Sequence, residues 1–474
     1  MQIRPLFAAV PLALAAFVAP AAAQDRPQPA APAVRPAAQA PAQGEAVSGE
    51  DPRIREIAGA PSAARVEADI RRLAGFGTRH TLSDTVSRTR GIGAARRWLF
   101  DEFQRISRAC GDCLEVRYVD SIIPGRPNTR IPTDTRVVDV VAIQRGRTDP
   151  NRYVLITAHY DSRVTDVMDA TSDAPGANDD ASGVAAALEA ARVLSRYRFD
   201  ASIVYAPLAG EEQGLNGGEI LARFAKDNGW NIAGVLNNDI IGNTRGQNGV
   251  TDNRTARVFG PGIPPTATQA ELRRILTTGG ELDTPSRQLM RYVDRVADRY
   301  VPNFDVLPIY RLDRFGRGGD HTPFFNLGFP AVRLTETWED YTRQHQNLRV
   351  ENGIRYGDVP DEVDFGYVAR MTALNAAALA SLAWAPPAPD SVTVAGGVSP
   401  STTLRWKPVS APDLAGYRVY WREPTSAQWQ WSRWVGNVTE AVLENIVIDN
   451  YFFGVAAVDR EGHESLPVFP LPGR

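Results

Sequence analysis

The chain has 474 residues, of which 43% are hydrophobic and 23% are charged, so it is long enough to bury more than one apolar core. Its formal net charge of −3, with no basic block, argues against a nucleic-acid-binding protein. We therefore expect a chain of several segments with no nucleic-acid partner.

The first 23 residues have the layout of a secretory signal peptide. Arg4 precedes an apolar run over residues 6–18, and small residues follow at 21–23. The apolar run is too short to span a membrane, which favours a cleaved signal over an uncleaved anchor. Residues 24–50 form a Pro/Ala-rich leader that we expect to be disordered. The sequence thus predicts export to the periplasm or the extracellular space, with no transmembrane anchor.

Two cysteines, Cys110 and Cys113, are present in the chain and stand close together. In an exported protein this spacing favours a small disulfide that fixes a turn. A redox dithiol and half of a zinc site are the other interpretations, although no second pair is present to complete a structural zinc cage.

From residue 137 the sequence alternates between strands and helices. Short runs rich in Val and Ile predict strands, and an Ala/Leu-rich run predicts a buried helix. Pro207 makes an uninterrupted central pairing of its own strand less certain. The alternation predicts a layered α/β domain with a mostly parallel sheet. The predicted strands span residues 137–143, 153–158, 203–209 and 232–239, and the buried helix spans 183–194.

Side chains that bind metals well follow the ends of these strands. Open α/β sheets bind their ligands at this edge, and carboxylates and imidazoles are ligands that zinc accepts. The candidates in chain order are His159, Asp179, the pair Glu211 and Glu212, and Asp239, with His321 later in the chain.

Several carboxylates gathered in one dry cleft would repel each other or become protonated without a cation. Two divalent ions about 3.5–4 Å apart would relieve the repulsion, with one carboxylate bridging them and an activated water. Glu211 and Glu212 are adjacent and point in different directions, so one can bind metal while the other exchanges a proton with that water and the leaving amine. The residues therefore predict a two-metal hydrolytic centre.

Five motifs in this order resemble those of the dizinc aminopeptidase family. That family includes bacterial leucyl aminopeptidases and aminopeptidase Y and, more distantly, glutamate carboxypeptidase and glutaminyl cyclase. The resemblance covers residues 51–384 and implies a mixed sheet with helices on both faces. The motifs are His159-Tyr160-Asp161-Ser162, Gly176-Ala177-Asn178-Asp179-Asp180-Ala181-Ser182-Gly183, Gly210-Glu211-Glu212-Gln213-Gly214, Asn237-Asn238-Asp239 and Asp320-His321.

Carried over to this sequence, the resemblance implies a site for two Zn²⁺ ions. Asp179 would bridge the metals, Asp161 would orient His159, and Glu211 would be the general acid/base. The peptide bond between Asp179 and Asp180 is expected to be cis. The other implied ligands are His159 and Asp239 for one zinc, and Glu212 and His321 for the other.

The sequence departs from the family in two places. Ile240 follows Asp239 where a methionine is frequent, and Tyr341-Thr342-Arg343-Gln344-His345-Gln346-Asn347 stands where many members have a Tyr-His-Thr motif. His345 either stabilises the tetrahedral intermediate or shapes the pocket, or it is an ordinary surface histidine. His80, in a polar loop, is likewise either a site residue or a surface histidine.

A long insert separates Asn243 from Asp313. Residues 286–300 within it have the apolar spacing of a helix, and the insert either covers part of the cleft or serves as scaffold. We expect the arginines near Asp313 to form ion pairs with neighbouring acidic residues rather than to bind a substrate carboxylate. They are Arg311, Arg314 and Arg317.

Residues 386–474 are predicted to form a separate all-β sandwich. A Pro-rich stretch at 386–389 marks the boundary, and short strand-like runs separated by turns follow it. The aromatic alternation in this part resembles a fibronectin type III domain. Trp429, Trp431 and Trp434 either contact a glycan or cover the edge of the sandwich.

Together these inferences predict an exported, zinc-dependent exopeptidase whose peptidase domain spans residues 51–385. An aminopeptidase that acts on peptides fits the ligand set best. The alternatives are a glutaminyl cyclase-like acyltransferase, which would leave one metal position unused, and a catalytically inactive binding protein on the same fold.

Overall fold

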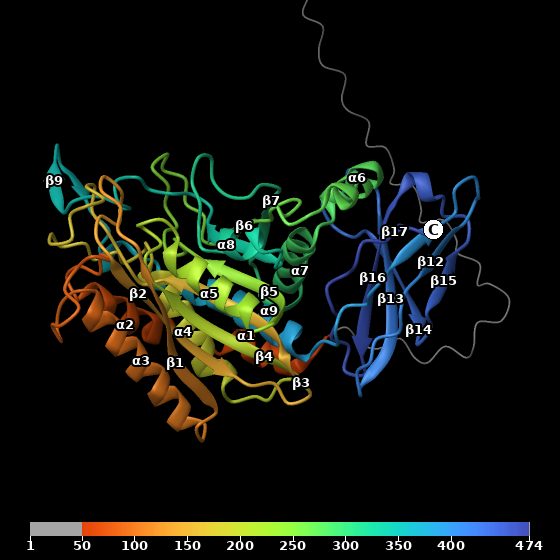
Figure 1. Ribbon diagram of the computed structural model, residues 1–474, viewed down its shortest axis with the longest axis horizontal. Coiled ribbons are helices and arrows are strands. Elements are labelled where there is room, and N and C mark those ends of the chain that lie inside the picture. The colour runs from red at the N-terminus through yellow and green to blue at the C-terminus, as the bar shows by residue number, and fades with distance from the viewer. Residues whose placement is uncertain (1–49, 474) are drawn as a thin grey trace, which may run out of the picture.

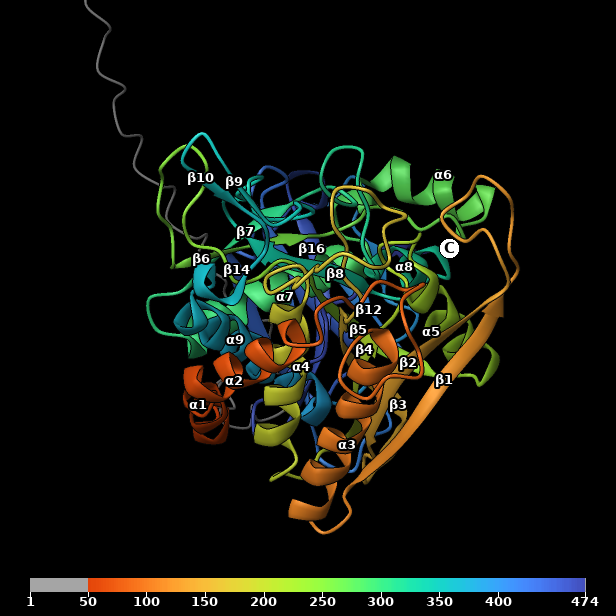
Figure 2. The same ribbon diagram turned by 90° about the vertical axis from the view of Figure 1, so that its left-hand side faces the viewer.

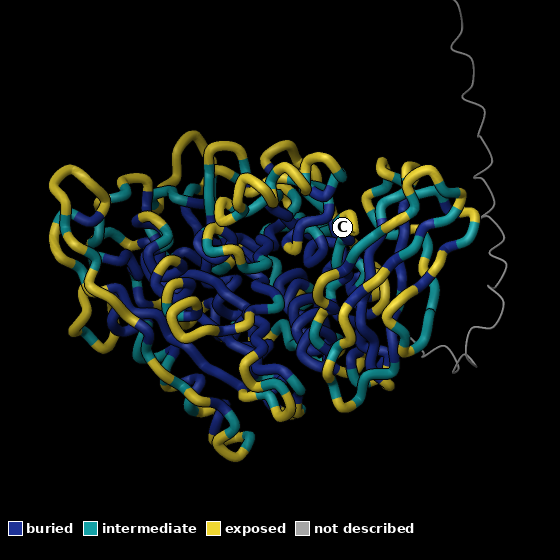
Figure 3. Tube along the Cα trace, turned by 45° about the vertical axis from the view of Figure 1, so that its right-hand side comes forward, coloured by how far each residue is buried: buried dark blue, intermediate teal, exposed yellow. Residues whose placement is uncertain are grey.

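The computed structural model describes residues 50–473, so the predicted signal peptide and nearly all of the predicted leader lie outside the described residues. A large sheet covered by helices is followed, beyond α9 (Phe365–Trp384), by a smaller group of strands (Figure 1). Each part has its own buried core, drawn in dark blue in Figure 3. The expected fold class, α/β with a C-terminal all-β part, is confirmed.

The first part is built on an eight-stranded mixed sheet with the strand order β1-β2-β4-β3-β5-β8-β6-β7. Parallel pairs join β4 to β3, β3 to β5, β5 to β8 and β6 to β7, whereas antiparallel pairs join β1 to β2, β2 to β4 and β6 to β8. The strands are β1 (Leu114–Ile123), β2 (Thr135–Gln144), β3 (Asp149–His159), β4 (Ala201–Leu208), β5 (Asn231–Asn238), β6 (Thr255–Phe259), β7 (Asp305–Ile309) and β8 (Ala331–Glu336).

Helices cover both faces of this sheet (Figures 1 and 2). α4 and α9 lie against one face with four further helices around them, and α5 and α8 lie on the other face. α4 is buried on all sides, as its Ala-rich sequence predicts. The helices that precede α9 are α1 (Pro52–Gly59), α2 (Ala63–Ala74), α3 (Ile92–Ala109), α4 (Ala181–Leu194), α5 (Asn216–Asp227), α6 (Gln269–Thr278), α7 (Pro285–Tyr300) and α8 (His321–Asn326). None of the helices in residues 50–473 is both long and apolar enough to cross a membrane.

Two local features agree with the sequence. Cys110 and Cys113 form the predicted disulfide directly after α3. Pro207 lies in β4 at a position paired with Ala158 of β3, beyond the three residues of β4 that pair with β2. Its missing N–H therefore costs the central sheet no hydrogen bond to β2.

The C-terminal part contains a four-stranded sheet, β15-β12-β11-β17, and a three-stranded sheet, β14-β13-β16. The ring of Trp429 contacts that of Tyr420, and the ring of Trp431 contacts that of Trp421, which agrees with a role in covering the sandwich. Glycan contact and the resemblance to a fibronectin type III domain stay predictions. The strands are β11 (Thr393–Ala395), β12 (Thr402–Arg405), β13 (Leu414–Arg422), β14 (Trp431–Gly436), β15 (Glu440–Leu443), β16 (Phe452–Asp459) and β17 (Leu471–Pro472), and the two-stranded β9 (Arg349–Glu351) and β10 (Ile354–Tyr356) form a separate hairpin.

Buried ion pairs join the two parts. Asp283, which precedes α7, lies 3.0 Å from Arg291 of α7 and 2.7 Å from Arg422 of β13. The three side chains are at most 1% exposed. Because a buried charge that loses its partner costs several kcal/mol, these pairs favour one arrangement of the two parts.

His463 joins the same two parts through both of its ring nitrogens. Nδ1 lies 2.6 Å from Asp459 of β16, and Nε2 lies 2.9 Å from Asp51 beside α1. The ring also stacks on Trp384 at the end of α9. Only the imidazolium can donate from both nitrogens. Burial opposes this charge, but Asp459 and Asp51 raise the pKa of His463 above its ordinary value.

We predict that His463→Gln lowers the free energy of unfolding and that its effect depends on pH. Because the pKa of His463 is raised in the folded state, its contribution is complete below the unfolded value of about 6.5 and is lost as pH rises through the folded value. Urea unfolding near pH 6 and near pH 9 should show the larger difference from wild type at pH 6. The exposed Lys407→Gln is the control, and an equal or larger effect of His463→Gln at pH 9 would contradict the assignment.

Candidate metal centre

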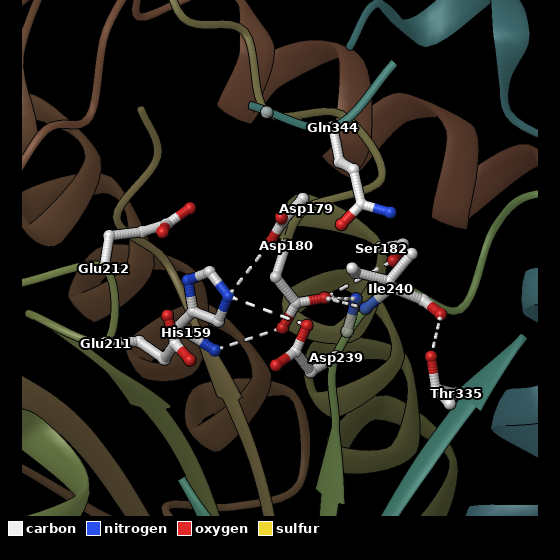
Figure 4. A network of polar contacts seen from close by, with 12 residues as sticks. His159, Asp179, Asp180, Ser182, Glu211, Glu212, Asp239, Ile240, Thr335 and Gln344 are labelled. Carbon is white, nitrogen blue, oxygen red and sulfur yellow. Dashed lines mark hydrogen bonds and ion pairs between the residues drawn. The ribbon is translucent and has the colours of Figure 1, made fainter. Parts of the chain in front are cut away.

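The metal-binding candidates come together at the carboxyl ends of the parallel strands (Figure 4). His159 ends β3, Glu211 and Glu212 follow β4, and Asp239 follows β5. Asp179 comes from the segment before α4. Because β3 lies between β4 and β5 and is parallel to both, the three ends meet at one edge of the sheet.

Asp179 lies between two groups of possible ligands. Nε2 of His159 is 3.1 Å from Oδ1 of Asp179 and 3.9 Å from Oδ1 of Asp239. On the other side, Nε2 of His345 is 2.9 Å from Oδ2 of Asp179 and 3.0 Å from Oε1 of Glu212. In each group the three ligand atoms lie within 4.8 Å of one another, so each group could hold one ion and Asp179 could contact both ions.

The structure places His345, and not His321, beside Glu212. His345 follows the end of β8, which is parallel to β5, and so it reaches the same edge as the other candidates. His321 begins α8, before β8, and its Nε2 lies 2.7 Å from the carbonyl oxygen of Leu312. Within residues 50–473, His321 belongs to no group of three potential ligands. The signal that distinguishes the two histidines is β8 itself, an apolar strand that the sequence predictions above omit.

Asp161 contacts three parts of the centre at once. Its carboxylate accepts the backbone N–H groups of Glu211 and Glu212 at 3.3 and 3.2 Å. Its Oδ1 lies 3.5 Å from Nδ1 of His159, and its backbone carbonyl oxygen lies 3.2 Å from the same nitrogen. These contacts fix the ring so that Nε2 faces Asp179, which is the position that a metal ligand needs.

Two more carboxylates hold the segment that carries Asp179. Asp358 accepts the backbone N–H of Asp179 at 2.7 Å. Asp180 accepts the N–H of His159 at 3.1 Å and that of Gly183 at 3.0 Å, so it caps α4 and ties this helix to β3. The peptide bond between Asp179 and Asp180 is cis, as the resemblance implies. No sequence pattern points to Asp358, because its partner is 179 residues away.

His80 is buried behind the centre and is not a surface histidine. Its Nε2 lies 2.9 Å from Nε2 of Gln213. The hydroxyl of Thr81 lies 2.6 Å from Oε1 of Gln213 and 2.9 Å from Oδ2 of Asp161. His80 therefore belongs to the polar network that supports Asp161 and does not itself reach either group of ligands.

Glu211 belongs to neither group of ligands and faces a cavity of about 340 Å³. Burial raises the pKa of Glu211 well above the ordinary value, and the adjacent Glu212 adds to this effect. A carboxyl group with a raised pKa is suited to accept and return a proton near neutral pH. The cavity is also lined by Asp179, Asp239, His345, Arg130, Arg163, Arg314 and Arg317.

Two of the three arginines near Asp313, Arg314 and Arg317, form ion pairs, the interpretation that the sequence favoured, whereas no ion pair of Arg311 is found within residues 50–473. Arg314 and Arg317 lie 3.4 and 3.0 Å from Glu339, and Asp313 lies 3.1 Å from Arg333. Arg314 and Arg317 also line the cavity, so these pairs form part of its wall.

The donor set of the centre fits divalent cations. Arg163 lies 2.8 Å from Oε2 of Glu212, and Arg333 lies 2.9 Å from Oδ1 of Asp239, so each neutralises part of the negative charge. Oε1 of Glu212 nevertheless is buried and accepts no well-aligned hydrogen bond within residues 50–473, although Nε2 of His345 lies 3.0 Å away. A buried carboxylate oxygen in this state is costly, and a cation held by carboxylate and imidazole ligands, such as zinc, would satisfy it.

Known proteins resemble this chain in sequence and in fold. The sequence profile of peptidase family M28 matches residues 139–352, which contain both groups of ligands. A probable zinc metalloprotease of Leptosphaeria maculans is 46% identical over 413 residues, which cover 87% of this chain and 95% of that protein. A probable zinc metalloprotease of Pyrenophora teres f. teres is 42% identical, over 89% of this chain and 87% of that protein.

The LapA aminopeptidase of Legionella pneumophila shares the fold, with a TM-score of 0.50 at 18% sequence identity over 72% of this chain and 77% of that chain. The agreement of profile, relatives and fold confirms the resemblance that the five motifs carry. The chain belongs to peptidase family M28.

Proposed function

We propose that this member of the family is an exported aminopeptidase that uses two zinc ions. The observation that carries the proposal is the position of Asp179, which offers one oxygen to each of two groups of ligands. A peptidase that depends on zinc is also what the names of the two relatives describe. Export rests on the signal-peptide pattern of the first 23 residues.

His159, Asp179 and Asp239 would hold one zinc, and Asp179, Glu212 and His345 the other. His345 thus takes the role that the motif comparison gave to His321. Nη2 of Arg163 lies 2.6 Å from Nδ1 of His345. A neutral imidazole that binds an ion through Nε2 carries its proton on Nδ1, and arginine can only donate, so Arg163 would have to turn away. Zinc in such sites polarises a carbonyl group and lowers the pKa of water toward about 7.

Glu211 supplies the proton exchange that peptide hydrolysis needs. Its carboxyl group lines the cavity and belongs to neither group of ligands, so it is free to take a proton from water and return it to the departing amine. Asp161 is a positioning residue, since it holds the backbone of Glu211 and the ring of His159 without lining the cavity. The peptide N-terminus would enter the same cavity, which Glu211 and the proposed ligands line.

Zinc content and a substrate panel test the proposed function against its alternatives. We expect two zincs per chain and hydrolysis of aminoacyl amides, but not of the same amides with a blocked N-terminus. One zinc together with pyroglutamate formation from glutaminyl peptides would indicate a glutaminyl cyclase-like enzyme. A protein without metal or turnover would instead be a binding protein on this fold.

We predict that Glu211→Gln keeps both zincs and lowers kcat by about 10²–10⁴-fold, because the amide cannot accept a proton while the ligands remain in place. Metal analysis and steady-state kinetics on an aminoacyl amide check this. Glu219→Gln, at an exposed position of α5, is the control and should behave as wild type. A Glu211→Gln variant with normal kcat would remove Glu211 from the chemistry.

We also predict that His345→Ala reduces the zinc content, whereas His321→Gln retains it. The first change removes a nitrogen that lies 3.0 Å from Glu212, and the second changes a side chain whose Nε2 is satisfied by Leu312. Zinc titration with a colorimetric chelator measures both variants. Zinc lost from His321→Gln and kept by His345→Ala would return the ligand role to His321.

A further inference from the structure

Arginine side chains form most of the cavity wall at the metal centre that the proposed ligands and Glu211 leave open. The cavity has a volume of about 340 Å³, and Leu215 supplies the one apolar side chain among the described residues that line it. An apolar side chain of a substrate gains little from binding here, because it would not leave water for apolar surroundings. Four arginines, which we call the arginine wall, line the cavity: Arg130, Arg163, Arg314 and Arg317.

The carboxylates that line the same cavity do not balance the arginine wall once the metals are bound. Asp179, Glu212 and Asp239 are proposed ligands, and Glu211 is the proposed base. Two divalent ions carry as much positive charge as these four carboxylates carry negative charge. Arg163, which pairs with Glu212, then shares its partner with a metal. The loaded cavity therefore has an excess of positive charge.

The acidic residues behind Arg314 and Arg317 do not remove this excess. Both arginines contact Glu339, at 3.4 and 3.0 Å, and Arg257 lies 2.7 Å from the same carboxylate. One negative charge thus faces three guanidinium groups. Arg314 also lies 3.2 Å from Asp313, but Asp313 pairs with a further buried arginine.

Arg130 is the member of the arginine wall that has no acidic partner within residues 50–473. Its side chain is exposed, and its Nη1 donates to the backbone carbonyl oxygen of Glu212 at 2.7 Å. A carbonyl oxygen carries no net charge, so this bond positions the guanidinium without neutralising it. The other N–H groups can bind a carboxylate through two parallel hydrogen bonds.

The segment between β1 and β2 fixes the backbone beside Arg130. The N–H of Arg126 donates to the carbonyl oxygen of Ile131 at 2.9 Å, and the hydroxyl of Thr129 lies 2.8 Å from the carbonyl oxygen of Arg126. The side chain of Ile131 is buried. A backbone that is already ordered loses less entropy when its side chain binds a ligand, so Arg130 is prepared for this task.

We propose that the cavity selects peptides whose N-terminal residue is aspartate or glutamate, with Arg130 bound to the side-chain carboxylate. The proposal rests on the proposed aminopeptidase activity and names its substrate class. Arg130 contacts the backbone of Glu212, which is next to the base Glu211, so a carboxylate bound there lies near the reacting centre. This carboxylate would also offset the charge of the N-terminal amine, which otherwise faces the arginine wall and the metals.

The test compares the glutamyl, glutaminyl and leucyl p-nitroanilides as substrates. We expect kcat/KM of the wild type to be at least about tenfold higher for the glutamyl than for the glutaminyl substrate, because their side chains have similar shapes but differ in charge. The leucyl substrate should also be poorer than the glutamyl one. Arg130→Gln should bring the glutamyl-to-glutaminyl ratio close to one, mainly through KM, and Arg130→Lys should keep part of it. Added NaCl should lower the ratio for the wild type, because salt screens the attraction.

Arg126→Gln is the matched control. Arg126 belongs to the same turn and is exposed, but it does not line the cavity, so this variant loses the same charge and should keep the wild-type ratio. Titration calorimetry of Glu211→Gln adds a measurement that needs no turnover. The α-amide of glutamate should bind to this variant at least about tenfold more tightly than the α-amide of glutamine.

The C-terminus of a dipeptide is another source of a carboxylate for the arginine wall. Leucyl-leucine and leucyl-leucine amide separate the two sources, because they differ only at the C-terminus. We expect similar kcat/KM for both. A preference of at least about tenfold for the free acid would overturn the proposal and indicate a dipeptidase.

Two further results would overturn the proposal. Equal kcat/KM of the wild type for the glutamyl and glutaminyl substrates would show that the cavity does not select a charge. A glutamyl preference that survives in Arg130→Gln would assign the recognition to another residue. If no p-nitroanilide were hydrolysed, the proposed aminopeptidase activity would be wrong, and the calorimetric comparison would still decide whether the cavity prefers an acidic residue.

Discussion

The negative charge gathered around Asp179 is the constraint on which the centre depends. Its two carboxylate oxygens face His159 and His345 at 3.1 and 2.9 Å, with the carboxylates of Glu212 and Asp239 alongside. Like charges so close together would separate if the chain could move. They cannot, because Asp358 holds the backbone of Asp179 and the other ligands stand on the ends of buried strands. A rigid excess of negative charge is what selects a site for divalent cations.

The parallel strands deliver the ligands to one edge of the sheet, and the C-terminal strands close part of the other edge. The buried pairs of Asp283 with Arg291 and Arg422, and the contacts of His463, fix that junction through charges that need each other. The chain therefore has two polar regions with different tasks. One concentrates charge of a single sign, and the other balances opposite charges.

Much of this arrangement could be predicted from the sequence because the information is local. Runs of Val and Ile that end in His159 or precede Asp239 identify both a strand and its last residue. The choice between His321 and His345 was missed because β8, the apolar strand whose end brings His345 to the same edge of the sheet, was not among the predicted strands. Asp358 and Arg333 were also missed, because their partners lie 179 and 94 residues away and no spacing along the chain connects them. Tertiary contacts of this kind leave no periodic signal.

The contacts of Asp161 have a consequence for how such a centre can change. One carboxylate fixes the backbone of Glu211 and Glu212 and the ring of His159. Any substitution that shifts it moves the proposed base, one ligand of each metal group and their spacing together. The positions of the proposed base and of these proposed ligands are therefore linked, and neither can be changed alone through this residue. Adaptation to new substrates is expected instead at Arg314 and Arg317, which line the cavity but pair with Glu339 and contact neither Asp161 nor a proposed ligand.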